Sequence, residues 1–283
     1  KEFQSRGGEI VVLDTGSSDE TWAVAKSLGC MVATVGDGYL HVIEQKEVDE
    51  INQRFIVDGE QPVVKAGDKY FDFSAARNHV ASLASNDVVC FADADEEITK
   101  LDIDKIENLI KQGIQQFEYN FVFNHDQWGR EAMKFVQSKM YDRRVLHWTG
   151  LVHEVLEGSG KRFFMDESIF KLEHWQIQHE RHSYLVGLAV DCFRHPEKDR
   201  NSHYFARELL WNGRPKSAIK EFDRHITMNA WHAERAQSMI FVGDAYGMIG
   251  QPEQQAASYS RAFYHDSSRR EALIKLARFF QHN

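Results

Sequence analysis

The spacing of hydrophobic residues changes near Trp175, and this change divides the chain into two parts. Before it, the short apolar run Glu9–Leu13 is followed by a polar turn, a helical stretch over Glu20–Leu28 and a second apolar run at Met31–Val35. Strands that alternate with helices are typical of a parallel sheet. We therefore predict an α/β domain over residues 1–175, built on a mostly parallel, Rossmann-like sheet.

Several elements of this domain follow from the same pattern. Glu9–Leu13 contains only one charged residue and is predicted to be buried on both faces. In the helix that follows, Trp22, Ala25 and Leu28 share one face and are predicted to point inward. Further elements are predicted at Phe73–Ser85 (helix), Asp87–Ala92 (strand), Lys105–Ile110 (helix), Tyr119–Phe123 (strand) and Lys134–Tyr141 (strand). The stretch over residues 36–72 shows no clear pattern, and no structure is predicted for it.

The second part, residues 176–283, is predicted to be an all-α domain of stacked helical hairpins. Its apolar residues recur at helical spacing, and two similar turns interrupt it, at Trp211–Pro215 and Met248–Pro252. The turns are separated by slightly more than the ~34 residues of a tetratricopeptide unit, so the repeat signal is weak. Stacked helical hairpins offer an extended surface for a protein partner, a peptide or self-association.

Composition narrows the classes of partner. The formal net charge is −9, and the hydrophobic fraction of 42% is that of a globular protein with a core. An acidic chain is a poor candidate for binding nucleic acid or an anionic membrane through its whole surface. No apolar stretch is long enough to span a bilayer. The three cysteines are far apart and form no CxxC pair, so neither a disulfide framework nor a zinc site is expected. No signal peptide is visible in the sequence, so we expect a cytoplasmic protein.

The strongest candidate for chemistry is Asp93-Ala94-Asp95, which directly follows the predicted strand Asp87–Ala92. In open α/β sheets, ligands bind outside the carboxyl ends of the strands. Two carboxylates at such a position can hold Mg²⁺ or Mn²⁺, and the cation can in turn hold a diphosphate. The alternative is a solvated acidic turn, because two aspartates at this spacing are common by chance.

Two further groups follow other predicted elements of the same domain. Asp14 can accept a hydrogen bond from a nucleobase, and Gly16 lets a ligand approach the backbone closely; otherwise this turn only caps a helix. Arg77 lies early in a helix, where it can pair with phosphate in a fork geometry. Without its context, Arg77 would be an exposed helix residue.

Together these segments resemble the family 2 glycosyltransferases of the GT-A fold, on the motifs DTGSSDET from Asp14, FDFSAARN from Phe71 and FADADEE from Phe91. The resemblance covers Glu9–Trp175. It implies a nucleotide-sugar donor, usually a UDP-sugar, and an inverting transfer of a hexose to a saccharide or protein acceptor. It also implies that Asp14 contacts the nucleobase, Arg77 the nucleotide, and Asp93 and Asp95 the metal–diphosphate group.

Two later segments extend the resemblance. Gly150-Leu151-Val152-His153-Glu154 is similar to the family's G-x-x-H-E segment, which lines the acceptor side. An inverting transfer needs a base for the acceptor's proton; Glu154 is the candidate, and His153 is the positioning residue or substitute base. His174 is similar to the histidine that completes the metal shell in GT-A enzymes. Each of these residues could instead be an ordinary surface or core side chain.

We therefore expect a metal-dependent glycosyltransferase that uses Mn²⁺ or Mg²⁺, with Glu154 and His153 as catalytic residues. Donor contacts are expected at Asp14, Gly16, Arg77 and Asp93, and metal ligands at Asp93, Asp95 and His174. The alternative is a non-catalytic protein that binds a nucleotide sugar and docks a partner through its helices. The intact Asp93-Ala94-Asp95 and His153-Glu154 motifs argue against that alternative. The absence of the family's first nucleotide-binding strand before Glu9 favours it mildly if the chain is complete. A nucleotidyltransferase would share the α/β pattern, but its Gly- and Arg-rich loop is absent from this sequence.

Overall fold

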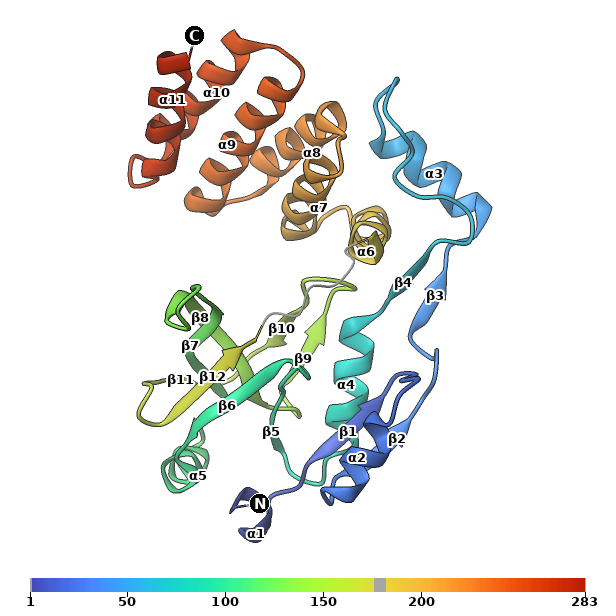
Figure 1. The fold of residues 1–283 in the computed structure, drawn as a ribbon, viewed down its shortest axis with the longest axis vertical. Helices are drawn as coiled ribbons and strands as arrows, with labels where there is room; N and C mark the ends of the chain where they lie inside the picture. The colour runs from blue at the N-terminus through green and yellow to red at the C-terminus, as the bar shows by residue number, and fades with distance from the viewer. Residues whose placement is uncertain (1, 176–181, 283) are drawn as a thin grey trace. The chain divides into compact units, whose positions relative to one another are not determined.

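The computed structural model describes residues 2–175 and 182–282 and divides the chain into two compact units (Figure 1). The first unit contains Lys1–Tyr39 and Asp72–Glu180, and the second contains Leu40–Phe71 and Arg181–Asn283. The stretch without a predicted structure therefore belongs mostly to the second unit. The predicted domain boundary at 175/176 adjoins residues 176–181, which lie outside the described residues.

The first unit is a mixed α/β structure. Its helices are α1 (Glu2–Ser5), α2 (Thr21–Ser27), α4 (Phe73–Leu83) and α5 (Ile103–Lys111). Its strands are β1 (Val11–Asp14), β2 (Met31–Thr34), β5 (Val88–Cys90), β6 (Glu96–Leu101), β7 (Gln116–His125), β8 (Glu131–Asp142), β9 (Leu146–Thr149), β10 (Val155–Gly158), β11 (Arg162–Met165) and β12 (Phe170–His174).

The main sheet is mostly antiparallel, so the prediction of a mostly parallel, Rossmann-like sheet is wrong. Its strand order is β5-β8-β7-β12-β6, with β11 also paired to β7. The pairs β5–β8, β7–β8 and β12–β6 are antiparallel, and only β11 and β12 run parallel to β7. The predicted βαβ unit exists only as the separate two-stranded parallel sheet of β1 and β2.

A tight turn explains the longest antiparallel pair. Asp126 follows β7, and its carboxylate accepts hydrogen bonds from the backbone N–H groups of Trp128 and Arg130, both at 2.9 Å. Gly129 supplies the positive φ of 75° that the turn requires. An Asp that bonds its own turn, followed by Gly, reverses the chain within a few residues. The two strands must therefore pair side by side in opposite directions.

The two-stranded sheet is more exposed than the sequence predicts. Residues Val11–Leu13 of β1 are half-buried instead of buried on both faces, and no residue of α2 is buried. Trp22 is 46% exposed and Leu28 61% exposed, so their predicted inward orientation is wrong. A two-stranded sheet offers too little surface to cover a helix face, which is why helical spacing alone misjudged their burial.

The core of the first unit lies between the main sheet and α5. It is formed mainly by alternating residues of β7, by residues of β12 and by the inward face of α5: Phe117, Tyr119, Phe121, Phe170, Leu172, Ile106 and Leu109. The spacing of two along β7 and of three along α5 is what each element requires to face one side. This core supports the sheet end where β5 and β6 meet the acidic segment.

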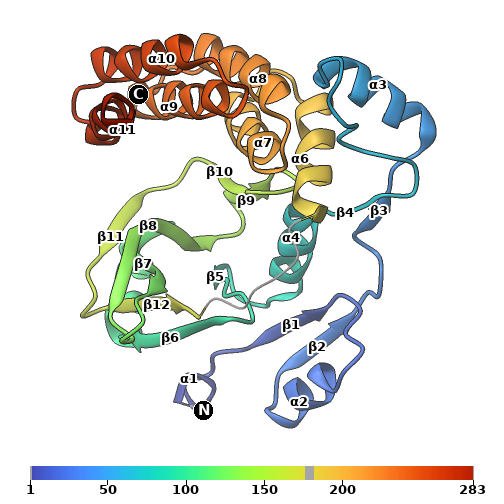
Figure 2. The ribbon, with the colours of Figure 1, turned by 45° about the horizontal axis from the view of Figure 1, so that its top comes forward.

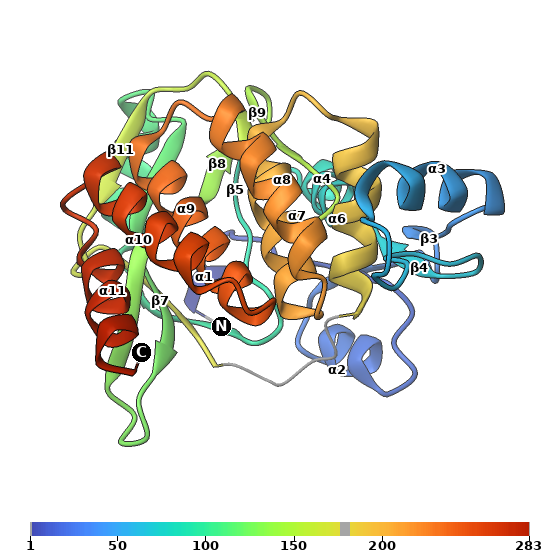
Figure 3. The same cartoon turned by 90° about the horizontal axis from the view of Figure 1, so that it is seen from above.

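The second unit is helical apart from one short strand pair. It consists of β3 (Leu40–Val42), α3 (Gln45–Phe55), β4 (Lys69–Phe71), α6 (His182–Arg194), α7 (Asp199–Trp211), α8 (Pro215–Met228), α9 (His232–Met248), α10 (Pro252–His265) and α11 (Arg270–His282). Helices α7/α8 and α9/α10 form hairpins at the two turns that the sequence indicates (Figure 3). Gly213 and Gly250 adopt positive φ there, and Pro215 and Pro252 begin the next helices. Within the described residues, no helix is long and apolar enough to cross a membrane.

Leu40–Phe71 packs at the N-terminal end of this helical array (Figure 2). Strand β4 and helix α3 contact α6, and α3 also contacts α8. The rings of Phe55 and Phe205, the latter on α7, meet edge to face at 4.9 Å. The segment therefore covers the apolar surface that the first hairpin would otherwise expose.

Candidate functional site

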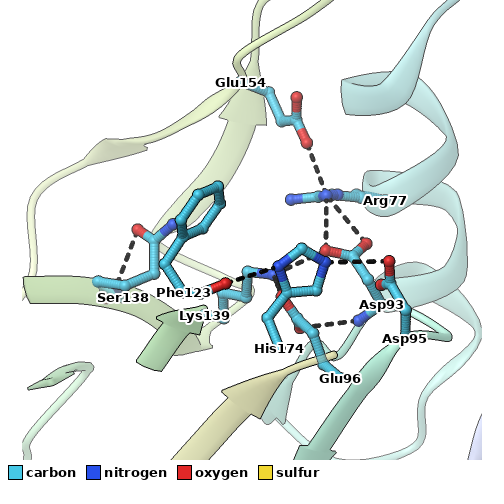
Figure 4. A network of polar contacts seen from close by, with 10 residues as sticks. Arg77, Asp93, Asp95, Glu96, Phe123, Ser138, Lys139, Glu154 and His174 are labelled. Atoms are coloured by element: carbon cyan, nitrogen blue, oxygen red, sulfur yellow. Dashed lines mark hydrogen bonds and ion pairs between the residues drawn. The ribbon is translucent and has the colours of Figure 1, made fainter. Parts of the chain in front are cut away.

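The acidic segment singled out by the sequence forms the connection between β5 and β6 (Figure 4). The backbone N–H of Asp93 donates to Glu96 Oε2 at 2.9 Å, and the backbone N–H of Glu96 donates to the Asp93 carbonyl at 3.0 Å. These reciprocal bonds hold the turn in one conformation. Asp93 and Asp95 are therefore presented by a preformed loop at the end of the sheet.

Asp93 lies between two positive side chains. Its carboxylate accepts hydrogen bonds from Arg77 Nη2 at 3.1 Å and from Lys139 Nζ at 2.7 Å. Lys139 reaches it because β8 pairs with β5, and the Lys139 side chain is only 5% exposed. Burial alone would raise the pKa of Asp93, but the charges of Arg77 and Lys139 hold it below its ordinary value.

The same lysine also pairs with Glu96. Burial of Glu96 raises the pKa of this carboxyl above its ordinary value, although the positive charge of Lys139 opposes the shift. One ammonium group thus contacts two neighbouring acids. Asp93 also pairs with Arg77, whereas Lys139 is the cation that the described contacts give to Glu96.

Asp95 is paired with His174 instead. The antiparallel pairing of β12 with β6 places His174 opposite Glu96. Glu96 directly follows Asp95 in the sequence, so His174 lies close to Asp95. His174 Nε2 lies 3.0 Å from Asp95 Oδ2, and His174 Nδ1 lies 3.1 Å from the Phe123 carbonyl oxygen. A carbonyl only accepts, so Nδ1 donates to the Phe123 carbonyl, and Nε2 is the ring nitrogen that faces Asp95.

A proton on Nε2, which then donates to the carboxylate, or a cation held by both side chains satisfies this contact. A carboxylate oxygen and an imidazole nitrogen, the latter fixed by a backbone carbonyl, suit a transition-metal ion such as Mn²⁺. The three predicted metal ligands therefore separate: Asp95 and His174 fit a cation as a pair, whereas Asp93 already pairs with Arg77 and Lys139.

Arg77 links Asp93 to Glu154, the predicted base. Its Nη2 atom lies 2.7 Å from Glu154 Oε1, and both side chains are largely buried, at 12% and 9% exposure. The guanidinium group also lies over the rings of Phe91 and Trp148, at 4.4 and 4.8 Å from their centroids. Aromatic rings and carboxylates together determine where this cation points.

The segment that carries His153 and Glu154 is held by α4. Asp72 caps this helix by accepting the N–H of Ala75 at 2.8 Å. Asn78 then exchanges two hydrogen bonds with the backbone of Trp148, at 2.8 and 2.9 Å. His153 has a φ of 55°, the one positive φ outside glycine among the described residues. Such a conformation is strained for a residue with a Cβ and is common at functional sites.

Asp14 and Gly16 lie at the end of β1, which packs against α4. The Asp14 carboxylate accepts the N–H of Ser17 at 3.0 Å, and hydrogen bonds from Ser17 hold the pKa of Asp14 below its ordinary value. Gly16 has a φ of 105°, which favours glycine. The described hydrogen bonds of Asp14 run to its own turn and to Val35, not to the acidic loop.

Three residues of this arrangement were missed by the sequence analysis: Lys139, Glu96 and Asn78. Lys139 lies in a predicted strand beside the buried residues Met140 and Tyr141, and a lysine in such a place needs an acidic partner. That signal was available. Glu96 and Asn78 lie inside motifs already quoted, but their partners are distant in sequence.

Searches of family models and of curated proteins returned no match to this chain. Among solved structures, two crystal structures of MamA match part of it. The first has 15% sequence identity and a TM-score of 0.32, and the match covers 35% of this chain and 57% of the MamA chain. The second has 15% identity and a TM-score of 0.31, and covers 35% and 53%. The match thus spans little more than half of either MamA chain.

These findings contradict the predicted membership of the family 2 glycosyltransferases. No family model matches, and the main sheet is mostly antiparallel instead of the mostly parallel sheet that the resemblance led us to expect. The predicted family is therefore wrong. What the site can do has to be argued from its own side chains.

Proposed function

We propose that the first unit transfers a sugar from a nucleoside diphosphate donor, such as a UDP-sugar, to a saccharide or protein acceptor. The observation that carries this proposal is the pairing of Asp95 with His174 beside the cations Arg77 and Lys139. A diphosphate leaving group needs positively charged partners, and the support for the proposal is that Arg77 and Lys139 lie beside a pair of side chains that suits a divalent ion.

Each side chain has a proposed role in an inverting displacement. The acceptor oxygen attacks the anomeric carbon while the bond to the diphosphate oxygen breaks, and the bonding electrons leave with the diphosphate. Glu154 accepts the acceptor's proton, and Arg77 binds a diphosphate oxygen. Asp14 and Gly16 are proposed to contact the nucleobase, and His153 to orient Glu154.

Asp95 and His174 are the residues that would hold the cation. When bound there, Mn²⁺ or Mg²⁺ would neutralise charge on the diphosphate as a Lewis acid. Asp93 is proposed to act through Arg77, whose position it fixes from the side opposite Glu154.

Calorimetry with UDP, with and without Mn²⁺, tests this proposal. We expect wild-type protein to bind UDP only weakly without the metal, and Asp95→Asn to lose at least about tenfold of the metal-dependent affinity, together with donor turnover. Asp104→Asn is the matched control, because this exposed aspartate pairs with Arg6 away from the loop.

Two results would contradict the assignment. Equal UDP binding with and without metal would show that no cation takes part in UDP binding. Full turnover of a UDP-sugar by Asp95→Asn would show that Asp95 has no role in the reaction. Metal-dependent binding without any turnover would instead favour a nucleotide-sugar-binding protein.

A further inference from the structure

We propose that Glu154 and the donor diphosphate compete for Arg77, so that the donor must bind before Glu154 can serve the acceptor. This inference rests on the proposed function and concerns the order of events at the same site. It follows from the geometry of one guanidinium group and its two carboxylate partners (Figure 4).

A single nitrogen atom of Arg77 serves both carboxylates. Nη2 lies 2.7 Å from Glu154 Oε1 and 3.1 Å from Asp93 Oδ1. An NH₂ group of arginine has two hydrogens, so these two contacts use both of them. A phosphate oxygen that binds this nitrogen must therefore displace one of the carboxylates.

Glu154 is the partner that can leave. Asp93 is also held by Lys139 at 2.7 Å and by its place in the closed acidic turn. For the Glu154 carboxylate, the described contacts show one ion pair, which is the one with Arg77. The rings of Phe91 and Trp148 support the flat guanidinium group without fixing which oxygen it meets at its edge. A small rotation in this aromatic slot can exchange carboxylate for phosphate.

The exchange links donor binding to the reaction. Before the donor binds, Glu154 Oε1 is paired with Arg77. A diphosphate carries more negative charge than a carboxylate and fits the fork of Arg. Once it takes Arg77, Glu154 is released to accept the acceptor's proton. Water or acceptor that arrives first meets a Glu154 carboxylate that is still paired with Arg77.

Competition predicts an unusual effect of Glu154→Gln on the affinity for UDP. Removing the carboxylate charge frees Arg77, so this variant should bind UDP with Mn²⁺ about threefold to tenfold more tightly than wild type, while transfer is lost. Glu157→Gln, on the strand that follows Glu154, is the matched control and should leave the affinity unchanged.

A double-mutant cycle isolates the contact. Arg77→Lys has no fork and should bind UDP more weakly, and in this background Glu154→Gln should no longer tighten binding. Glu154→Asp covers the case in which Glu154→Gln does not fold. Its side chain is one methylene shorter, breaks the 2.7 Å contact while keeping the charge, and should also bind UDP more tightly.

The outcomes separate this inference from the proposed function. If wild-type protein binds no UDP under any metal condition, the proposed function fails. If wild-type binding is metal-dependent but folded Glu154→Gln or Glu154→Asp binds UDP equally or more weakly, only the competition for Arg77 is overturned. Tighter binding in the variants, abolished by Arg77→Lys, supports it.

Discussion

Lys139 shows how much one buried residue controls at this site. Its ammonium group meets Asp93 and Glu96 together, and its side chain is 5% exposed. Without Lys139, the Glu96 carboxylate, whose side chain is 3% exposed, would lose its cation and would repel the neighbouring Asp93 carboxylate. The acidic loop therefore depends on Lys139 for its stability as well as for its shape.

Replacing Lys139 with Met tests this dependence. The variant leaves the buried Glu96 without its cation and Asp93 with Arg77 alone, so we expect the free energy of unfolding to fall by about 3 kcal/mol. Adding Glu96→Gln should restore part of the loss, because only one charge then remains beside Arg77. Urea unfolding measures both.

Lys134→Met is the control for this experiment. Lys134 lies on the same strand, but it is 38% exposed and pairs with Glu131 and Glu167 near the surface. Exposed pairs contribute about 1 kcal/mol or less. Equal losses in the two variants would mean that the burial of Lys139 has no special effect.

At the scale of elements, helix α8 begins on a side chain from a distant segment. Arg214, its N-cap residue, makes no side-chain capping bond. Instead the Glu60 carboxylate accepts the backbone N–H groups of Lys216 and Ser217, at 2.7 and 2.9 Å, and the Ser217 hydroxyl. A carboxylate at a helix N-terminus satisfies free N–H groups and interacts favourably with the helix dipole. Residues 40–71 are thus part of the helical unit by hydrogen bonding as well as by packing.

Removing this carboxylate should weaken the helical unit. We expect Glu60→Ala to lower the free energy of unfolding by about 1–2 kcal/mol, the range measured for lost helix caps. Asp58→Ala, at an exposed position two residues earlier, should change it by less than about 0.5 kcal/mol. Thermal unfolding followed by circular dichroism at 222 nm distinguishes the two. If Glu60→Ala had the same free energy of unfolding as wild type, water would satisfy the N–H groups of α8 as well as the Glu60 carboxylate does.

At the scale of the whole molecule, a buried polar chain in the helices makes stability depend on pH. The Ser238 hydroxyl lies 2.8 Å from His203 Nδ1 and 2.9 Å from His225 Nδ1, and His225 Nε2 lies 3.3 Å from Glu234. Burial lowers the pKa of His203 to about 3, against an ordinary value of 6.5. The folded protein therefore keeps His203 neutral where the unfolded chain binds a proton.

The sign of the effect follows from that difference. Above pH 6.5 neither state protonates His203, and its contribution is fully present; between 6.5 and 3 only the unfolded chain gains the proton, so stability falls as pH falls. pH 5 lies about 1.5 units below the ordinary pKa of 6.5, so protonation of the unfolded chain lowers the free energy of unfolding by roughly 2 kcal/mol. Urea unfolding at pH 7 and pH 5 should show this loss in wild type and a smaller one in His203→Gln. The exposed His147→Gln should behave as wild type, and the same pH slope in all three proteins would exclude His203 as the source.

How far the site could be foreseen varies from residue to residue. Asp93 and Asp95 were chosen for their place after a predicted strand, Arg77 for its place in a predicted helix, and Glu154 for the resemblance of its segment to a family motif. The structure brings Arg77 to both Asp93 and Glu154. The pairing of Asp95 with His174 joins residues 79 apart in sequence. No local pattern predicts such a contact, because it depends on the alignment of β12 with β6.

The sequence by itself determined the features that arise between near neighbours in the chain. The turns at Gly213 and Gly250 and the helices on either side of them follow from positive φ, proline and helical spacing, which act over a few residues. Only the tertiary structure decided the strand order, the exposure of α2, the place of Leu40–Phe71 and the partners of Lys139. These depend on which surfaces meet after the chain folds, and the free energy of such contacts is not carried by any short segment.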